Sequence, residues 1–175
     1  PQGLPVLYLH GGPGAGSGVN NRRFFDPEIY RIIQFDQRGS GKSIPSPSID
    51  STPHNLVEDI EFIRNHLKID KWLVSGGSWG TTLALLYAIK YSNNVLGFIL
   101  RGIFLATEEE YQWLYGNNGV AKFFPDYYRE FTSKNIRGTT DVVAGYHRLL
   151  CGQNELASIS ASKAWYLWEG RLSSL

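Results

Sequence analysis

The chain has 175 residues, of which 42% are hydrophobic, and its 17 basic and 16 acidic residues give a formal net charge of +1. This length predicts one sizeable core, and the balanced charge argues against binding to nucleic acid or to an anionic membrane. The lack of an apolar run of ~20 residues argues against a membrane span. The single cysteine, Cys151, excludes an internal disulfide and favours a reducing compartment, the cytoplasm.

The first third of the chain alternates apolar runs with glycine-rich loops. Residues 4–9 and 29–36 are short apolar runs that end in such loops, so both are predicted to be buried strands. Residues 51–69 keep apolar side chains at a helical period, Thr52 suits the N-cap and Pro53 suits the first turn. We therefore expect strand, strand, helix.

The same alternation continues to Gly102. Residues 71–76 predict a strand, the segment from Thr81 to about Tyr91 a helix, and residues 95–102 another strand. Strands that alternate with helices are typical of a parallel sheet with crossover helices, which is an α/β fold.

After Gly102 the pattern changes to aromatic-rich helical segments without a convincing strand. We interpret this region as an α-helical insertion over the carboxyl edge of the sheet. The predicted helices cover residues around 108–115, 125–133, 141–150 and 155–169.

Residues 76–80, GGSWG, match the pattern G-x-S-x-G between a predicted strand and a predicted helix. In that context the serine, Ser78, lies on a tight turn that lifts its hydroxyl above the sheet as a nucleophile, and flanking side chains would clash, which explains Gly76 and Gly80. The alternative is a glycine-rich turn that serves only tight packing.

A second motif, HGGPG at residues 10–14, directly follows the first predicted strand. An oxyanion hole in this architecture takes one amide from the residue after the nucleophile and one from the loop after an earlier strand. The expected donors are therefore Trp79 and Gly12. We interpret His10 as a residue that ties the loop down by hydrogen bonding, not as the catalytic base.

The stretch GSGKS at residues 39–43 superficially suggests a phosphate-binding loop. The full pattern requires a glycine at position 36, which is aspartate, and a helix directly after, where IPSPS stands instead. Likewise HGGPGAGSG does not complete G-x-G-x-x-G, because position 19 is valine. A nucleotide cofactor is therefore not expected, and no ligand cluster implies a metal.

Three stretches together, HGGPGAG, DQRGSGKS and GGSWGTTLAL, resemble the proline iminopeptidase (prolyl aminopeptidase) branch of the α/β-hydrolase fold, and RGIFL at 101–105 and AWYLWEG at 164–170 agree. The resemblance spans nearly the whole chain. It implies part of the hydrolase core at residues 1–104 and part of a helical cap domain at residues 105–175.

The resemblance also implies site residues. Ser78 is then the nucleophile, and Glu169 is a cap carboxylate that binds the free amino terminus of the substrate. The chemistry agrees, because an aminopeptidase must bind a cationic amine, and a carboxylate partly desolvated among Trp165 and Trp168 attracts a cation more strongly. Phe104 and Tyr115 are expected as walls for the prolyl ring. The alternative that Glu169 is only an exposed helix residue remains open. Tyr166 departs from the family's pattern, in which a small residue is expected at this position.

The catalytic acid and base should follow Ser78 in the chain. Only His147 does so, and Asp141 with His147 falls in a predicted helix, where positions six apart point to different faces. We expect instead that the base and acid lie on residues outside this sequence, which begins at what resembles the third strand of the family's sheet and stops within the cap.

Together, the motifs and the resemblance imply that the protein containing this chain is a serine aminopeptidase that releases N-terminal proline from small peptides through a prolyl-enzyme. This chain alone is not expected to be competent. Two alternatives stay open: an esterase or amidase of the same fold, and a non-catalytic binding protein derived from a hydrolase. No cofactor, nucleic acid or membrane partner is expected.

Overall fold

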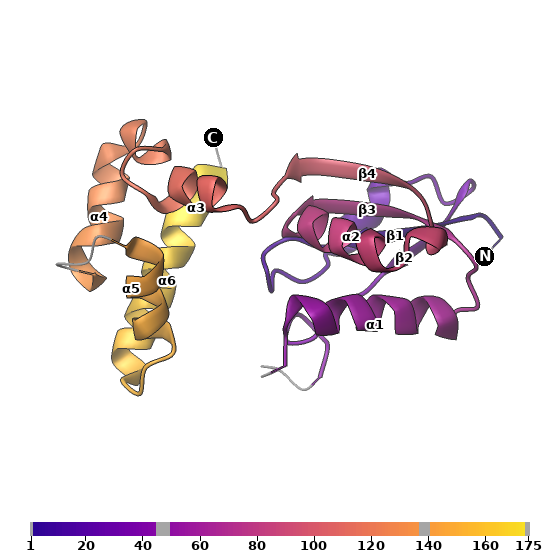
Figure 1. Cartoon of the computed structure of the whole chain (residues 1–175), viewed down its shortest axis with the longest axis horizontal. Coiled ribbons are helices and arrows are strands. Elements are labelled where there is room, and N and C mark those ends of the chain that lie inside the picture. Colours follow the sequence, from indigo (N-terminus) through magenta and orange to yellow (C-terminus); the bar gives the residue numbers. More distant parts are fainter. Residues whose placement is uncertain (1, 45–49, 137–140, 174–175) are drawn as a thin grey trace. The chain divides into compact units, whose positions relative to one another are not determined.

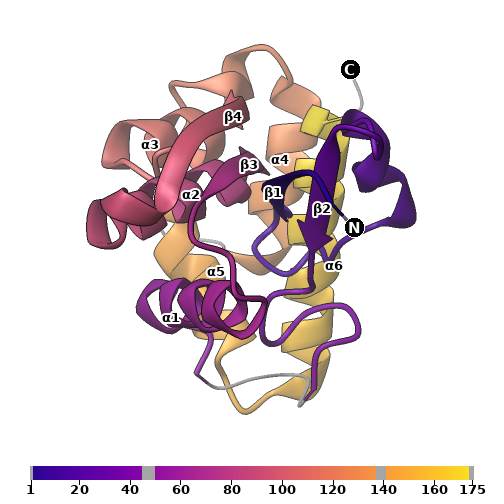
Figure 2. The same cartoon turned by 90° about the vertical axis from the view of Figure 1, so that its right-hand side faces the viewer.

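Four strands form one parallel sheet in the computed structural model, which describes residues 2–44, 50–136 and 141–173. The strand order is β2-β1-β3-β4, and it can be followed in Figure 2. The middle of β1 is paired on both sides, since Leu7 lies opposite Ile33 of β2 and Val74 of β3. The predicted strands and the parallel sheet are confirmed. Their bounds are β1 Leu4–Leu9, β2 Tyr30–Gln34, β3 Trp72–Ser78 and β4 Val95–Ile103.

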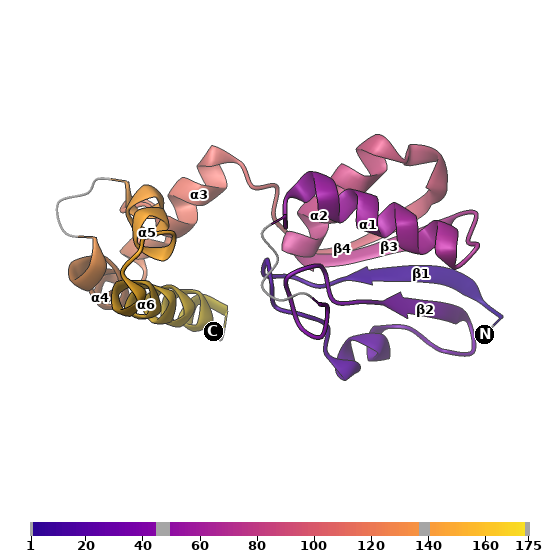
Figure 3. The same ribbon diagram turned by 90° about the horizontal axis from the view of Figure 1, so that it is seen from below.

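Helices α1 (Pro53–His66) and α2 (Trp79–Lys90) pack on one face of this sheet (Figure 3). The predicted start of α1 is confirmed, because Thr52 Oγ1 accepts the Asn55 N–H at 3.2 Å with Pro53 in the first turn. Apolar side chains of both helices and of the sheet form a buried core on this face, whose members include Leu7, Leu9, Leu56, Ile60, Trp72, Val74, Leu83 and Tyr87. This core holds the carboxyl ends of β1 and β3 in place beneath the loops that follow them.

The opposite face of the sheet carries a smaller cluster. Val6 and Tyr8 of β1 pack there with Phe25, which follows a short 3-10 helix at Val19–Phe24. The edge strand β4 presents large apolar side chains to solvent, namely Leu96, Phe98, Ile99 and Ile103, which are 40–61% exposed.

The chain divides into two compact units, residues 1–106 and 107–175. Among its described residues the second unit holds four α-helices, coloured from salmon to yellow in Figure 1, and all four predicted helical segments are confirmed. Its core is aromatic, with the Phe131 ring stacked on those of Tyr146 and Trp168 at centroid distances of 4.6 and 5.2 Å. The helices are α3 Glu108–Tyr115, α4 Pro125–Asn135, α5 Val142–Leu150 and α6 Glu155–Ser173.

Helix α2 begins at Trp79, two residues before the predicted start at Thr81, and β3 runs on to Ser78. The reason is that one residue, Ser78, reverses the chain through a positive φ of 53°, so strand and helix meet without an intervening loop. Three short 3-10 helices, at Val19–Phe24, Ser92–Asn94 and Val120–Lys122, were not predicted.

Candidate active site

Ser78 stands at the junction of β3 and α2 in a conformation that L-residues rarely adopt. Its φ and ψ are 53° and −123°, and its side chain is exposed. A non-glycine residue held in such a sparsely populated region costs about 1–3 kcal/mol and is typically found at functional sites. The predicted tight turn that presents the hydroxyl to solvent is therefore present.

The glycines on either side of Ser78 are required by backbone contacts. A Cβ at Gly76 would lie 2.3 Å from the carbonyl oxygen of Gly80, and a Cβ at Gly80 would lie 2.3 Å from that of Leu9. Both distances are far below van der Waals contact, so the turn closes onto itself and onto the end of β1 only with glycine at these positions. The predicted steric reason for both glycines is confirmed.

The loop after β1 lies against Ser78. A Cβ at Gly11 would stand 3.5 Å from Ser78 Cβ, and the next residue, Gly12, has a φ of 117° and is exposed. Trp79 is the first residue of α2, where unsatisfied amides and the helix dipole favour an anion. The structure thus brings Ser78, the Gly12 loop and the Trp79 amide to one edge of the sheet.

His10 is 2% exposed and both of its ring nitrogens are engaged. Nδ1 lies 2.8 Å from the carbonyl oxygen of Gly11, and Nε2 accepts the backbone N–H of Gln37 at 3.0 Å. These bonds agree with the interpretation of His10 as a residue that ties down the loop. They also introduce Gln37, a buried residue that the sequence analysis did not single out.

The carboxylate of Asp36 joins the loops that follow β1 and β2. It accepts the backbone N–H groups of Ser17 at 2.6 Å and Lys42 at 2.8 Å, and these two bonds hold the pKa of Asp36 below its ordinary value. The loop folds around this carboxylate, since a Cβ at Gly41 would overlap it. The sequence IPSPS, at residues 44–48, argues against a phosphate-binding loop because no helix is expected there. Residues 45–48 of it lie outside the described residues.

Replacing Asp36 with asparagine is expected to lower the free energy of unfolding at pH 7 by about 1–3 kcal/mol, because the amide NH₂ meets one of the two N–H donors. Since the folded-state pKa of Asp36 is depressed, its stabilisation is full above the unfolded-state pKa of about 4 and disappears as the pH falls through the folded-state pKa. Urea unfolding of both forms between pH 2 and 7 checks this, with a difference that narrows in acid. A difference in unfolding free energy that does not change with pH contradicts this prediction. Asp126→Asn, at an exposed position, is the control and should change the free energy of unfolding by less than about 0.5 kcal/mol.

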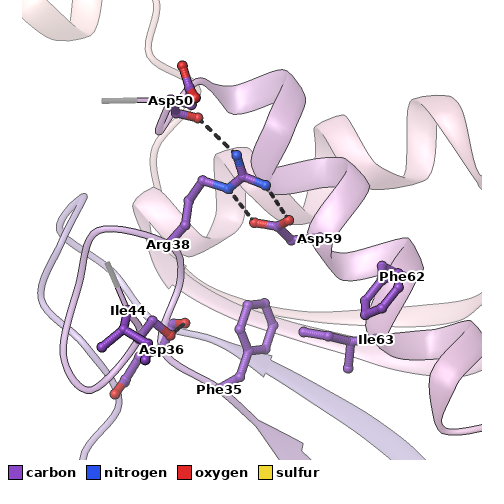
Figure 4. Close-up of a pocket in the computed structure, with 9 residues that line it drawn as sticks. Phe35, Asp36, Arg38, Ile44, Asp50, Asp59, Phe62 and Ile63 are labelled. Carbon is purple, nitrogen blue, oxygen red and sulfur yellow. Dashed lines mark hydrogen bonds and ion pairs between the residues drawn. The ribbon is translucent and has the colours of Figure 1, made fainter. Parts of the chain in front are cut away.

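Arg38, the next residue but one, ties the same loop to α1. Its Nε and Nη2 donate to the two carboxylate oxygens of Asp59 at 2.6 and 2.5 Å, and Nη1 donates to the carbonyl oxygen of Asp50 at 3.3 Å (Figure 4). This pair borders a hollow of about 460 Å³, also lined by Phe35 and Phe62. Ser78 does not line that hollow, so we assign the Arg38 pair to anchoring the loop.

Phe104 follows β4 and is held against the start of α2. Its backbone N–H donates to Thr81 Oγ1 at 2.9 Å, and its carbonyl oxygen accepts from Thr82 Oγ1 at 2.6 Å. Thr81 Oγ1 also lies 2.7 Å from the carbonyl oxygen of Ser78. The structure therefore places the backbone of Phe104 beside the turn of Ser78, and its ring is half-buried.

Tyr115 and Glu169, both in the second unit, are joined directly. Tyr115 Oη donates to Glu169 Oε1 at 2.6 Å, and Trp165 Nε1 donates to the same oxygen at 2.8 Å. Burial of Tyr115 and, after it, the bond to Glu169 hold the pKa of its phenol far above the ordinary value, so it remains a donor at neutral pH. The carboxylate of Glu169 is thus fixed on one side by two donors.

The surroundings of Glu169 differ in part from the expectation. Glu169 is exposed, and of the two tryptophans only Trp165 contacts its carboxylate. Trp168 is 1% exposed and donates instead to the carbonyl oxygen of Leu114, because it lies on the side of α6 that faces the aromatic core. Tyr166 is 75% exposed, on the outer face of the helix.

His147 lies on a helix, α5, as predicted, and Asp141 directly precedes that helix. Asp141 is the N-cap of α5, with Oδ1 accepting the Ala144 N–H at 3.0 Å, and His147 stands in the last turn. The carboxylate of Asp141 therefore caps the helix, and this contact is different from the one by which a catalytic aspartate orients a histidine. Within the described ranges no three His, Cys, Asp or Glu side chains are grouped to hold a metal ion, and no helix there is long and apolar enough to cross a membrane.

Residues 5–174 match the family model of the alpha/beta hydrolase fold. The chain is 49% identical over 173 residues to a proline iminopeptidase of Arabidopsis thaliana, covering 97% of this chain and 45% of that protein. It is 45% identical to the proline iminopeptidase of Neisseria gonorrhoeae, covering 98% of this chain and 56% of that protein. The resemblance drawn from the motifs is confirmed, and the chain spans about half the length of these curated relatives.

Solved structures agree on the fold. An alpha/beta fold family hydrolase from Bacillus anthracis is 19% identical and aligns with a TM-score of 0.53 over 98% of this chain and 60% of its own. A thermophilic esterase from Thermogutta terrifontis is 27% identical, with a TM-score of 0.53 over 77% of this chain and 49% of its own. The predicted α/β fold with a parallel sheet is confirmed.

Proposed function

The chain belongs to the alpha/beta hydrolase family, and from this premise we propose that the protein that contains it is a serine aminopeptidase that releases proline from the amino terminus of small peptides. The single observation that carries the proposal is the strained, solvent-facing Ser78 between β3 and α2, with a glycine loop against it. The names of the curated relatives supply the substrate class.

In the proposed reaction, Ser78 Oγ attacks the carbonyl carbon of the N-terminal prolyl residue while a histidine outside this sequence takes its proton. The amides of Gly12 and Trp79 stabilise the tetrahedral oxyanion. The same histidine protonates the leaving amine, and water then cleaves the prolyl ester to regenerate Ser78 and release proline. We assign the nucleophile and the donors to residues 1–104 as hydrolase core.

Recognition of the substrate's cationic imino group is assigned to Glu169, in the cap formed by residues 105–175. The fixed position of its Oε1, between Tyr115 and Trp165, supports this role, because a carboxylate that is held in place binds a cation with less loss of conformational entropy. Within the described part of the chain, Oε2 accepts no hydrogen bond. Phe104 and Tyr115 remain our proposed walls for the prolyl ring.

Replacing Glu169 with glutamine tests the aminopeptidase against the rival esterase or amidase of the same fold. The loss of a charge-assisted bond, worth about 1.5–3 kcal/mol, should lower kcat/KM for prolyl amides by roughly 10- to 150-fold. Simple esters that lack an amino group should be spared. Glu155→Gln, at the exposed start of the same helix α6, is the matched control. Equal loss on both substrates contradicts the role of Glu169 and favours the rival.

A cytoplasmic location is part of the proposal. It rests on the cysteine content of the chain, because a single cysteine that forms no disulfide is typical of a reducing compartment. That cysteine, Cys151, is a free and exposed thiol. The substrates we propose are small peptides with N-terminal proline.

A further inference from the structure

Gln37, in the loop after β2, is 3% exposed and uses both ends of its side-chain amide. Its Nε2 donates to the carbonyl oxygen of His10 at 2.9 Å, and its Oε1 accepts from Trp79 Nε1 at 3.1 Å. These partners are separated from Gln37 by 27 and 42 positions in the sequence. One buried side chain therefore connects three segments that meet only in the folded state.

Both partners belong to segments that adjoin Ser78. His10 directly precedes the glycine loop that lies against Ser78, and Trp79 directly follows Ser78. The backbone N–H of Gln37 also donates to His10 Nε2 at 3.0 Å, and Ser40 Oγ lies 3.2 Å from the same nitrogen. The segments that carry our two proposed oxyanion donors are thus held at a fixed spacing through Gln37.

We propose that Gln37 is a positioning residue of the oxyanion hole, which sets the separation of the Gly12 and Trp79 amides through its bonds to His10 and to the Trp79 indole. The inference rests on the proposed function of Ser78 as nucleophile. Gln37 is not a catalytic residue, because its contacts are with His10 and Trp79 and not with the reacting atoms.

A carboxamide satisfies both contacts, because it carries a donor and an acceptor. The partner on one side, the His10 carbonyl, is an acceptor, and the partner on the other, the Trp79 indole N–H, is a donor. An ionised glutamate at position 37 offers acceptors only and repels the His10 carbonyl, and a leucine of similar size offers neither a donor nor an acceptor. The backbone N–H bond from residue 37 to His10 Nε2 survives every such substitution, so the loop keeps one of its anchors.

A small displacement of these segments matters because oxyanion donors must lie 2.7–3.1 Å from the developing negative charge. Complete loss of one donor typically costs about 10²- to 10³-fold in kcat. Loss of the Gln37 side chain leaves both donors present but misplaced, so we expect a smaller reduction, of about 10- to 100-fold. The effect should fall on kcat, since the ground-state carbonyl is bound less strongly by these donors than the transition state.

The experiment compares Gln37→Glu and Gln37→Leu with the matched control Gln34→Leu, in the protein that contains this chain. Gln34 lies in the same strand-and-loop segment and donates to the carbonyl oxygen of Gly18 at 3.2 Å, while within the described residues its buried Oε1 has no hydrogen-bond partner. Three quantities are measured: the rate at which an aryl phosphonate labels Ser78, kcat and KM for a prolyl amide and for a p-nitrophenyl ester, and the indole ¹H–¹⁵N resonance of Trp79.

The expected result is a 10- to 100-fold fall in the labelling rate and in kcat for both Gln37 variants, with KM within about threefold of wild type. The Trp79 resonance, assigned by its loss in Trp79→Phe, should move in Gln37→Leu and not in Gln34→Leu. A moved resonance with unchanged labelling and unchanged kcat overturns the proposal, since Gln37 is then only structural. An equal fall in Gln34→Leu overturns it also.

The phosphonate separates this inference from the proposed function. If the wild-type protein is labelled at Ser78 but releases no proline, the aminopeptidase proposal fails and the Gln37 inference is still decided by the labelling rates. If wild type is not labelled at all, both fail. Should Gln37→Leu not fold, Gln37→Glu, which has nearly the same shape, decides the inference through the same readouts.

Discussion

Replacing Ser78 with alanine in the protein that contains this chain is expected to reduce proline release by on the order of 10⁶-fold, the size of effect found when the nucleophile of a serine hydrolase is removed. Binding of the peptide should change little, because the hydroxyl makes its bond to the substrate only along the reaction path. Steady-state release of proline from a prolyl dipeptide measures this. Ser75→Ala, at a buried position in the same strand β3, is the matched control and should retain turnover.

The same variant decides between an enzyme and a binding protein derived from a hydrolase. An activated serine reacts rapidly with an aryl phosphonate, and the covalent adduct adds a fixed mass at one residue. Labelling of wild type and none of Ser78→Ala supports the nucleophile. If Ser78→Ala keeps its turnover, the proposed mechanism is wrong. If wild type resists the reagent but still binds prolyl peptides, a non-catalytic binding role is the better account.

A second large effect is expected at Gly80. Alanine there places a Cβ 2.3 Å from the carbonyl oxygen of Leu9, and the obstacle is backbone, which cannot turn away as a flexible side chain would. β1 and α2 must separate, so we expect the free energy of unfolding to fall by about 3 kcal/mol or more, at the upper end of the range for overpacked interiors. Urea unfolding followed by circular dichroism measures the change.

Gly97→Ala in β4 is the control for this prediction. Its Cβ would lie 3.5 Å from Leu73 Cδ2, which is ordinary van der Waals contact, and we expect a change within about 1 kcal/mol. A stability of Gly80→Ala equal to that of Gly97→Ala would mean that the approach of α2 to β1 is less tight than described.

The elements and the central turn could be predicted from the sequence because each depends on neighbours along the chain. Among the described residues, apolar periodicity identified the four strands and the α-helices but not the 3-10 helices, and Thr52 with Pro53 placed the start of α1. The G-x-S-x-G pattern identified the turn at Ser78 in part for the same reason, since the clash that requires glycine at position 76 is with Gly80, in the same five residues. The requirement for glycine at position 80 comes from Leu9 of β1 and is not local.

The connections within the candidate site could not be predicted in this way. The contact of Trp79 with Gln37 spans 42 positions and that of Tyr115 with Glu169 spans 54, and no local pattern encodes either. The stretch at residues 36–43 was informative only as a family marker. In the structure, three successive side chains of this stretch connect it to three other segments: Asp36 bonds to the loop after β1, Gln37 to that loop and to α2, and Arg38 to α1.

The conformation of Ser78 has an evolutionary consequence. With φ at 53° and ψ at −123°, glycine would occupy this position with less strain than serine does, so stability alone selects against the serine. A lineage released from the need for a nucleophile would gain stability by exchanging it. A serine at this position is thus costly in stability, and the role of nucleophile that we propose for Ser78 accounts for that cost.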